Sequence, residues 1–378
     1  MVEIKKQKGL VSVGLADFLG TGITAIFWFF LASIIEPGKY GEIFYFLGIA
    51  GIATSIALLG TQNVITVFVA KKIKIQSTLY LISVINGIVL SFAIMIVFSK
   101  IDISFMILAY IINTLAIGDL LGRASFVSYT KYFLLQKILT LVLGIGFYYA
   151  FGYEGILFAL ALAYSAYLIR VYKGFRDSKI DFSLMKSNAK FITNNYLLSI
   201  ANISKNQVDK IIIPLFLSFT VLGNYALALQ IFSVLHILPN IIFKYILPLD
   251  SVGNSNKKLK KLSVILSVVI AIIASITVPL ILPIIFPNYI VAIDAIRIMS
   301  FALIPATISA ILTSKLLAAE NSVPLLIGRT ILFSTIVIGM IILGMSYGII
   351  GIATSFLLAN SLETVFLSFY TRRQKNET

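Results

Sequence analysis

The sequence has no cysteine and only one histidine, His236, among its 378 residues. Thiolates and imidazoles hold most structural zinc ions and iron–sulfur clusters, so we expect no such centre and no disulfide framework. Composition leaves a carboxylate-bound metal open, but we expect no metal ligand set and no cofactor. Charged residues make up only 12% of the chain and hydrophobic residues 59%, against roughly 25% and 45 to 50% in soluble domains. This balance excludes a water-soluble fold.

The chain also lacks the glycine-rich phosphate-binding loops G-x-x-x-x-G-K-[ST] and G-x-G-x-x-G. Nothing therefore indicates nucleotide hydrolysis or dinucleotide binding by those loops. A membrane-embedded glycosyl or acyl transferase would need a general base and a substrate-binding loop, and the lone His236 with short loops offers neither. We predict that the protein is not an enzyme and has no catalytic residue.

Apolar stretches of about 20 residues recur along the whole chain, and each is long enough to cross ~30 Å of hydrocarbon as a helix. We predict an all-α polytopic membrane protein with about twelve transmembrane helices. The predicted spans cover residues 10–35, 43–70, 78–98, 103–123, 133–151, 154–171, 190–218, 224–247, 262–286, 292–315, 323–345 and 347–369.

The formal net charge of +15 has two readings, a nucleic-acid partner or a membrane topology signal. Most of the 30 Lys and Arg residues lie in loops on one predicted side, and only Lys39 and Lys100 lie in loops on the other. Basic loops mark the cytoplasmic side of membrane proteins. We therefore predict both termini in the cytoplasm, a place in the cytoplasmic membrane, and no nucleic-acid partner.

Two short motifs occur twice in the same order. Residues 38–40 (Gly-Lys-Tyr) match residues 223–225 (Gly-Asn-Tyr), and the G-x-x-G of residues 152–155 matches that of residues 348–351. Glycine and tyrosine are also common at membrane interfaces, which is the alternative explanation. An even number of spans between equivalent points predicts two parallel six-helix repeats.

The predicted lobes are an N-terminal one over residues 1–175 and a C-terminal one over residues 190–378. A basic cytoplasmic linker, residues 176–189, joins them.

With these motifs the chain resembles the multidrug, oligosaccharidyl-lipid and polysaccharide exporter superfamily, and within it the polysaccharide-type lipid-linked oligosaccharide flippases. The likeness covers nearly the whole chain and rests on the order of its motifs. These are residues 37–41 (Pro-Gly-Lys-Tyr-Gly), 209–213 (Asp-Lys-Ile-Ile-Ile), 222–226 (Leu-Gly-Asn-Tyr-Ala), 247–248 (Leu-Pro) and the two G-x-x-G starts.

The resemblance implies two six-helix lobes around a cavity that opens alternately to either side. It also implies a flippase that moves a polyprenyl-diphosphate-linked oligosaccharide across the membrane for polysaccharide or surface-glycan biosynthesis. The expected partners are the lipid-linked glycan, membrane lipids and glycan-biosynthesis enzymes. The alternative is an ion-coupled exporter of organic cations, which has the same architecture.

Ionisable residues inside spans are costly in hydrocarbon and are the first candidates for function. Lys205 lies near the middle of its span, and Lys210 lies about a turn and a half further along. Both could attract a diphosphate or acidic sugars. The alternative is that Lys205 and Asp209, four residues apart, neutralise each other. We predict Lys205 and Lys210 as substrate-binding residues.

Asp17 lies inside the first span with no opposite charge within four residues. A buried carboxylate could take up a proton or help to coordinate sodium, so we predict Asp17 as an ion-coupling residue, unless it only faces a wet cavity. Asp119 and Arg123, four residues apart at the inner end of the fourth span, form either a structural pair or a cytoplasmic-entrance site. In the second case Arg123 binds substrate and Asp119 takes part in ion coupling.

Overall fold

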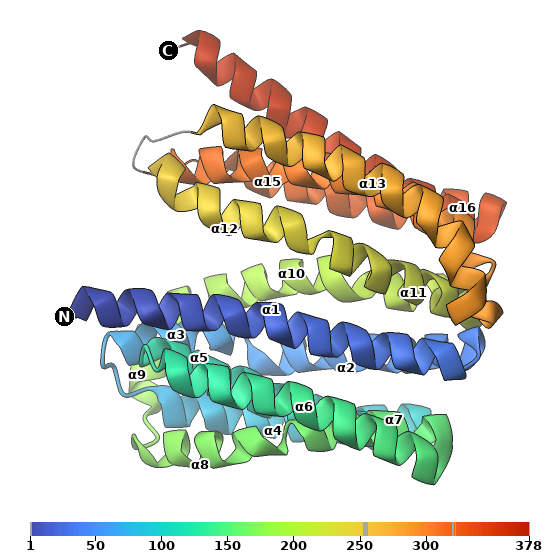
Figure 1. Ribbon diagram of the computed structural model, residues 1–378. Helices are drawn as coiled ribbons and strands as arrows, with labels where there is room; N and C mark the ends of the chain where they lie inside the picture. The colour runs from blue at the N-terminus through green and yellow to red at the C-terminus, as the bar shows by residue number, and fades with distance from the viewer. Residues whose placement is uncertain (1, 252–255, 320, 322, 378) are drawn as a thin grey trace. The chain divides into compact units, whose positions relative to one another are not determined.

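The computed structural model describes residues 2–251, 256–319, 321 and 323–377 (Figure 1). The description excludes the side chains of residues 2–13, 198, 200–206, 244, 245, 248, 249, 251 and 374–377. Every regular element in the described ranges is a helix. The prediction of an all-α chain is confirmed.

The helices group into two compact units. The first unit comprises Met1–Trp28 and Tyr45–Val208, and the second comprises Phe29–Phe44 and Asp209–Thr378. The end of the first helix and the start of the second therefore belong with the C-terminal half of the chain. The lobe boundaries expected from the repeats, with a linker over residues 176–189, stay a prediction.

In the first unit, α5 is central and packs against α3, α4 and α7 (Figure 1). The short helix α8 packs against both α4 and α5. The α-helices that contribute to this unit are α1 (Val2–Ile34), α2 (Pro37–Leu58), α3 (Thr61–Ala70), α4 (Gln76–Phe98), α5 (Ile101–Gly122), α6 (Phe126–Phe151), α7 (Gly155–Ala163), α8 (Leu168–Arg176), α9 (Phe182–Ser187) and α10 (Ala189–Phe216).

In the second unit, α15 packs against α12, α13 and α16, and α14 packs against α11, α13 and α16. The unit also takes the last part of α10. The remaining α-helices are α11 (Phe219–Leu235), α12 (Ile237–Ser251), α13 (Lys257–Ile285), α14 (Ala292–Phe301), α15 (Leu303–Ala318) and α16 (Val323–Glu377).

Nine stretches of the described residues are long and apolar enough to cross a membrane. Two of them, Phe126–Arg176 and Val323–Arg373, contain 51 residues each, about twice the length needed for one crossing. Each contains a glycine with positive φ, Gly152 (70°) or Gly348 (59°), at the G-x-x-G starts. A side chain is strained in this conformation, so glycine permits the change of chain direction there. The chain is a multi-pass membrane protein, and the number of twelve spans stays a prediction.

One predicted span was wrong as a continuous helix. The span over residues 43–70 is divided between α2 and α3 at Leu59 and Gly60, both with positive φ (49° and 73°). The spans over residues 224–247 and 292–315 lie mostly in the apolar stretches Phe219–Phe243 and Ala292–Ala318, in which single residues, His236 and Ala302, separate consecutive helices. The interruption within residues 43–70 coincides with Gly60 and the polar residues 61–63, which hydropathy averaged over a whole span does not resolve.

The two occurrences of the Gly-x-Tyr motif contact each other inside the second unit. A Cβ added to Gly41 would lie 1.9 Å from the carbonyl oxygen of Phe219, and one added to Gly223 would lie 1.8 Å from that of Pro37. The first turns of α2 and α11 therefore touch backbone to backbone. The tyrosines of the two motifs, Tyr40 and Tyr225, are also alike, because both side chains are almost fully buried.

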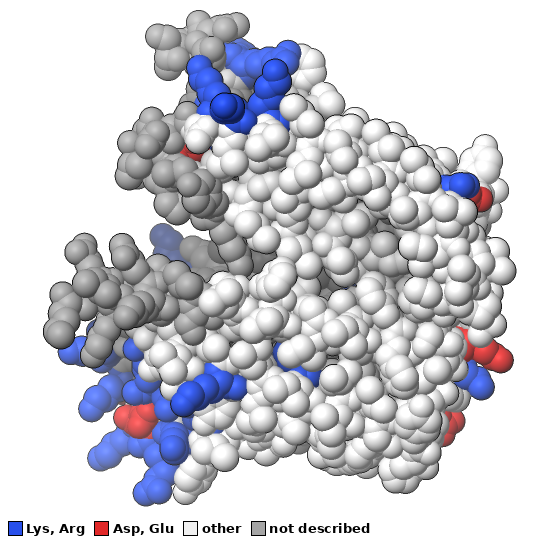
Figure 2. Space-filling model, in the orientation of Figure 1, with Lys and Arg blue, Asp and Glu red and all other residues white. Residues whose placement is uncertain are grey.

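Charged side chains of the first unit are concentrated at one end of its helices. Figure 2 shows Lys and Arg gathered at the end where α3, α8 and α9 lie, beside a broad middle zone with few charges. The apolar middle of α4 is mostly exposed, including Ile88, Val89 and Phe92. Such a zone suits contact with lipid chains rather than water.

Candidate functional site

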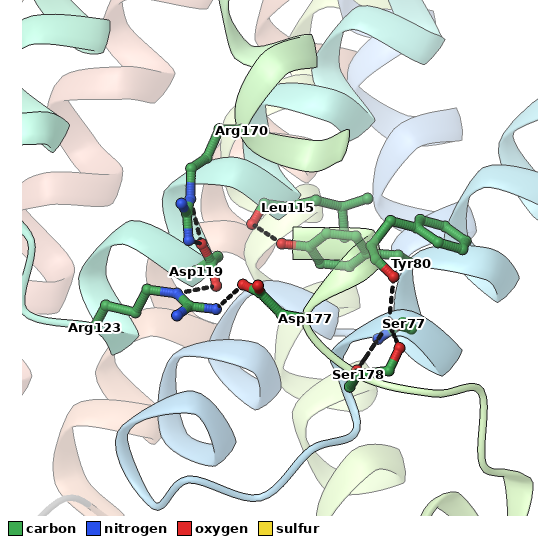
Figure 3. A network of polar contacts seen from close by, with 9 residues as sticks. Ser77, Tyr80, Leu115, Asp119, Arg123, Arg170, Asp177 and Ser178 are labelled. Carbon is green, nitrogen blue, oxygen red and sulfur yellow. Dashed lines mark hydrogen bonds and ion pairs between the residues drawn. The ribbon is translucent and has the colours of Figure 1, made fainter. Parts of the chain in front are cut away.

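A charged network lies at the end of α5. The carboxylate of Asp119 is fully buried, and the guanidinium groups of Arg123 and Arg170 approach it from different elements (Figure 3). Arg123 Nε donates to Asp119 Oδ1 over 2.8 Å, and Arg170 Nε donates to Asp119 Oδ2 over 2.5 Å. Both carboxylate oxygens thus have a cationic partner, which offsets the cost of burying the charge.

The same network holds the segment that follows α8. The second arm of the Arg123 guanidinium pairs with Asp177. Ser77 Oγ, in the first turn of α4, donates to the carbonyl oxygen of Ser178 over 2.7 Å (Figure 3). Thr78 Oγ1 accepts from the backbone N–H of Asp181 over 2.7 Å. Residues 177–181 are therefore fastened to the ends of α4 and α5.

Asp181 also begins the next helix. Its carboxylate accepts from Ser183 Oγ over 2.6 Å and from the backbone N–H groups of Ser183 and Leu184. These hydrogen bonds lower the pKa of Asp181 from its ordinary value, because they stabilise the ionised carboxylate. The start of α9 is thus defined by a local cap.

A second feature of the first unit is a polar cavity of about 400 Å³ where α2, α3, α5 and α10 meet. None of the described residues that line it is Asp, Glu, Lys or Arg, and most carry hydroxyl or amide groups. The polar cavity is lined by Gly51, Thr54, Ser55, Leu58, Gly60, Thr61, Gln62, Asn63, Tyr110, Thr114, Ser199 and Gln207.

The break between α2 and α3 forms one wall of the polar cavity. Leu59 adopts a left-handed conformation that costs a non-glycine residue of the order of 1 kcal/mol. Gly60 follows it and lies against the backbone of α10, since an added Cβ would be 2.5 Å from the carbonyl carbon of Asn195. Interrupted helices of this kind place backbone polar groups in the substrate sites of transporters.

The amides of Gln62 and Asn63 are available inside the polar cavity. Asn63 is exposed and Gln62 is partly exposed, and neither side chain has a hydrogen-bond partner among the described residues. By contrast, the hydroxyl of Thr114 donates to the carbonyl oxygen of Tyr110 in its own helix over 2.8 Å. The cavity therefore presents neutral donors and acceptors, which can hydrogen-bond an uncharged polar ligand.

The structure places the predicted substrate lysines differently. The side chain of Lys205 lies outside the described residues. Lys210 is partly buried in the second unit, where it interacts electrostatically with the neighbouring Asp209. Asp209 in turn accepts a hydrogen bond from Tyr225. Lys210 is not among the described residues that line the polar cavity, and the role of both lysines as substrate-binding residues stays a prediction.

The predicted ion-coupling residues lie apart in the first unit. Asp17 is partly buried on α1, and its Oδ1 accepts from the hydroxyl of Tyr129 on α6 over 3.3 Å. Asp119 is the centre of the network at the end of α5. The structural pair expected between Asp119 and Arg123 is present, while the roles of Asp17, Asp119 and Arg123 in transport stay predictions. No group of three His, Cys, Asp or Glu residues that could hold a metal ion occurs in the described part of the chain.

Sequence reasoning missed two sets of residues. Arg170 was interpreted only as a loop charge, and Asp177 lay unremarked in the predicted linker, although both complete the Asp119 network. The polar cavity was also missed, although Gly60 and the adjacent polar residues 61–63 interrupt an apolar run. That interruption was the available signal, because a polar group inside a predicted span usually faces a cavity or a partner.

The fold was compared with those of known proteins. No family model matches the chain, and no curated protein matches it either. Solved structures do match over nearly the full chain. The lipid II flippase MurJ in an inward closed conformation has a TM-score of 0.76 at 14% identity, over 96% of this chain and 87% of its own.

Two transporters of the MATE type are also similar. An inward-facing multidrug resistance MATE family transporter of the MOP superfamily has a TM-score of 0.69 at 14% identity, over 94% of each chain. A MATE transporter of Vibrio cholerae has a TM-score of 0.57 at 14% identity, over 99% of this chain and 98% of its own. The chain shares its fold with these solved structures. These neighbours are transporters and not enzymes, and at such low identity the likeness establishes the fold alone.

Proposed function

We propose that this protein is a flippase that moves a polyprenyl-diphosphate-linked oligosaccharide across the cytoplasmic membrane by alternating access, for polysaccharide or surface-glycan biosynthesis. The observation that carries the proposal is the polar cavity, which has amides and hydroxyls but no described charged side chain. Sugar hydroxyls hydrogen-bond well to such groups. An organic cation would instead favour a carboxylate, which none of the described lining residues supplies.

The fold supports a transporter but not the choice of cargo, because the similar structures include both a lipid II flippase and multidrug transporters. In this proposal the sugar contacts Gln62 and Asn63, and Lys205 and Lys210 attract the diphosphate. Asp17 couples transport to a proton or sodium gradient. Membrane lipids and glycan-biosynthesis enzymes are the proposed partners.

The test is translocation in proteoliposomes, with a lipid-diphosphate-linked oligosaccharide and a lipophilic cation followed in parallel, with and without proton and sodium gradients. We expect movement of the glycolipid and none of the cation. Movement of the cation alone would make the protein a drug exporter. Dependence on a gradient that disappears in Asp17→Asn would support ion coupling.

A matched pair of variants tests the polar cavity itself. Thr114→Val and Thr330→Val each remove a hydroxyl that bonds a carbonyl oxygen four residues earlier in its own helix, but only Thr114 lines the cavity. We expect Thr114→Val and Asn63→Ala each to slow glycolipid translocation roughly two- to tenfold, the range for one lost neutral hydrogen bond. Thr330→Val should leave it unchanged. Equal rates of glycolipid translocation in all three variants would show that this cavity is not the sugar site.

A further inference from the structure

A second pocket of the first unit lies at the charged end of its helices and is separate from the polar cavity. Its volume is about 540 Å³, and no residue lines both. We call it the basic pocket. It is lined by Val69, Ala70, Lys72, Ile73, Lys74, Gln76, Gly122, Arg123 and Asp177.

The charges of the basic pocket favour an anion. Lys72, Lys74 and Arg123 supply three cations, and Asp177 supplies one carboxylate that already pairs with Arg123. Lys72 and Lys74 are exposed and have no ion-pair partner among the described side chains. Two ammonium groups therefore remain available at the rim, each with three donors that suit phosphate oxygens.

The backbone holds both lysines in place. The turn after α3 is closed by hydrogen bonds from the N–H of Lys72 to the carbonyl oxygen of Val69 (3.0 Å) and from the N–H of Ile73 to that of Phe68 (2.8 Å). Lys72 itself has a φ of 58°, in the left-handed region. A turn fixed in this way holds the backbone of both lysines beside the pocket, so binding needs to order only their side chains.

Gln76 is a buried polar residue of the basic pocket with unused hydrogen-bonding capacity. It begins α4 and lines the basic pocket, and it is only 6% exposed. Its Oε1 is buried without a hydrogen-bond partner, and no described residue bonds its amide nitrogen. A buried amide left unsatisfied costs about 1 to 3 kcal/mol. The Oε1 atom is an acceptor and needs a donor, such as the ammonium group of a nearby lysine, whereas the amide N–H can donate to a phosphate oxygen.

We propose that the basic pocket binds a phosphate group through Lys72, Lys74, Arg123 and Gln76. Positive charge predicts that this end of the unit faces the cytoplasm, at the level of the lipid headgroups. The phosphate could belong to a diphosphate-linked lipid, an anionic phospholipid or a soluble phosphate compound. The site does not depend on which cargo the transporter moves.

The first experiment measures binding of inorganic pyrophosphate to the full-length protein in detergent by calorimetry. The variant Lys72→Gln with Lys74→Gln should raise the Kd about tenfold or more, the scale for losing hydrogen bonds to a charged group. The control Lys257→Gln with Lys258→Gln removes the same charge from exposed positions outside the pocket and should change the Kd less than about twofold. Equal weakening by both pairs, or no binding by the parent protein, would overturn the proposal.

Gln76→Met separates a binding role from a structural one. The replacement keeps the side-chain volume and removes the unsatisfied amide, so the protein should unfold at the same or a higher temperature. We expect weaker pyrophosphate binding at the same time. A variant that is destabilised but binds pyrophosphate as the parent does would show that Gln76 is only structural and would remove it from the site.

Competition identifies the source of the phosphate. A polyprenyl diphosphate, nanodiscs with phosphatidylglycerol, and nanodiscs with phosphatidylcholine alone are each tested for displacement of pyrophosphate. Displacement by the polyprenyl diphosphate supports a lipid carrier, and displacement only by phosphatidylglycerol supports a phospholipid. If Lys72 and Lys74 bind pyrophosphate but neither lipid displaces it, the natural ligand is a soluble phosphate compound. Glycolipid translocation without any phosphate binding would refute this proposal and leave the proposed function intact.

Discussion

At the scale of single residues, Asp119 is the most highly connected charge in the described part of the first unit. It joins α5 to Arg170 of α8, and through Arg123 it is linked to Asp177. Residues separated by 51 and 54 positions in the sequence are therefore held together by one carboxylate and one guanidinium group. The basic pocket borders this network, because Arg123 and Asp177 line it.

Asp119→Asn should destabilise the protein strongly. The change removes the counter-charge of two guanidinium groups, of which Arg170 is 16% and Arg123 35% exposed. We expect a loss of about 2 to 4 kcal/mol, below the value for a fully buried pair because Arg123 is partly solvated. Thermal unfolding in detergent measures the effect. The control Asp294→Asn removes an exposed ion pair with Arg297 and should cost less than about 1 kcal/mol.

The cap at Asp181 should be sensitive to acid. Because the folded protein lowers the pKa of Asp181, its contribution is complete at neutral pH and is lost as the pH falls below about 4 through that lowered pKa. We expect the protection of the amide protons of Ser183 and Leu184, measured relative to their intrinsic exchange rates at each pH, to fall in that range. Protection that does not change with pH in Asp181→Asn would be the matching control result.

At the scale of elements, the first turns of α2 and α11 depend on two glycines. Gly41→Ala and Gly223→Ala would each place a Cβ within 2 Å of a carbonyl oxygen of the other helix. The helices must then separate, and overpacking of this kind costs about 1 to 3 kcal/mol or more. We expect a clearly lower unfolding temperature for each variant.

Gly38→Ala is the control for these variants. It lies one turn earlier in α2, and its added Cβ would meet only Thr220 Oγ1 at 3.3 Å. This change should have little effect on the unfolding temperature. If Gly38→Ala lowered the unfolding temperature as much as Gly41→Ala, the overlap of an added Cβ with the other helix would not be the cause of the loss. The close approach of α2 and α11 would then be wrong.

At the scale of the whole molecule, the absence of cysteine allows the topology to be tested directly. Lys258→Cys and Asn288→Cys would place single thiols near the two ends of α13, at exposed positions. We expect a membrane-impermeant maleimide to label Asn288→Cys in intact cells and Lys258→Cys only after permeabilisation, because basic loops stay on the cytoplasmic side. The reverse pattern would invert the predicted orientation of α13.

Much of the fold was predictable because membrane insertion is a local property of the chain. Apolar runs and basic loops predicted an all-α, multi-pass protein, and the two G-x-x-G starts marked the positions where Gly152 and Gly348 turn the chain. Gly60 and the polar residues 61–63 were a signal for a break in the span, but the left-handed conformation of Leu59 was not predictable, because leucine is normally favourable in a helix.

The sequence by itself determined that the chain is helical and crosses a membrane several times, since hydrocarbon requires each segment to satisfy its own backbone hydrogen bonds. Only the tertiary structure decided which charges are paired and which are available. Asp119 meets Arg170 and Gln76 remains without a partner because of how α4, α5 and α8 pack. Such contacts join residues far apart in the sequence, and hydropathy carries no information about them.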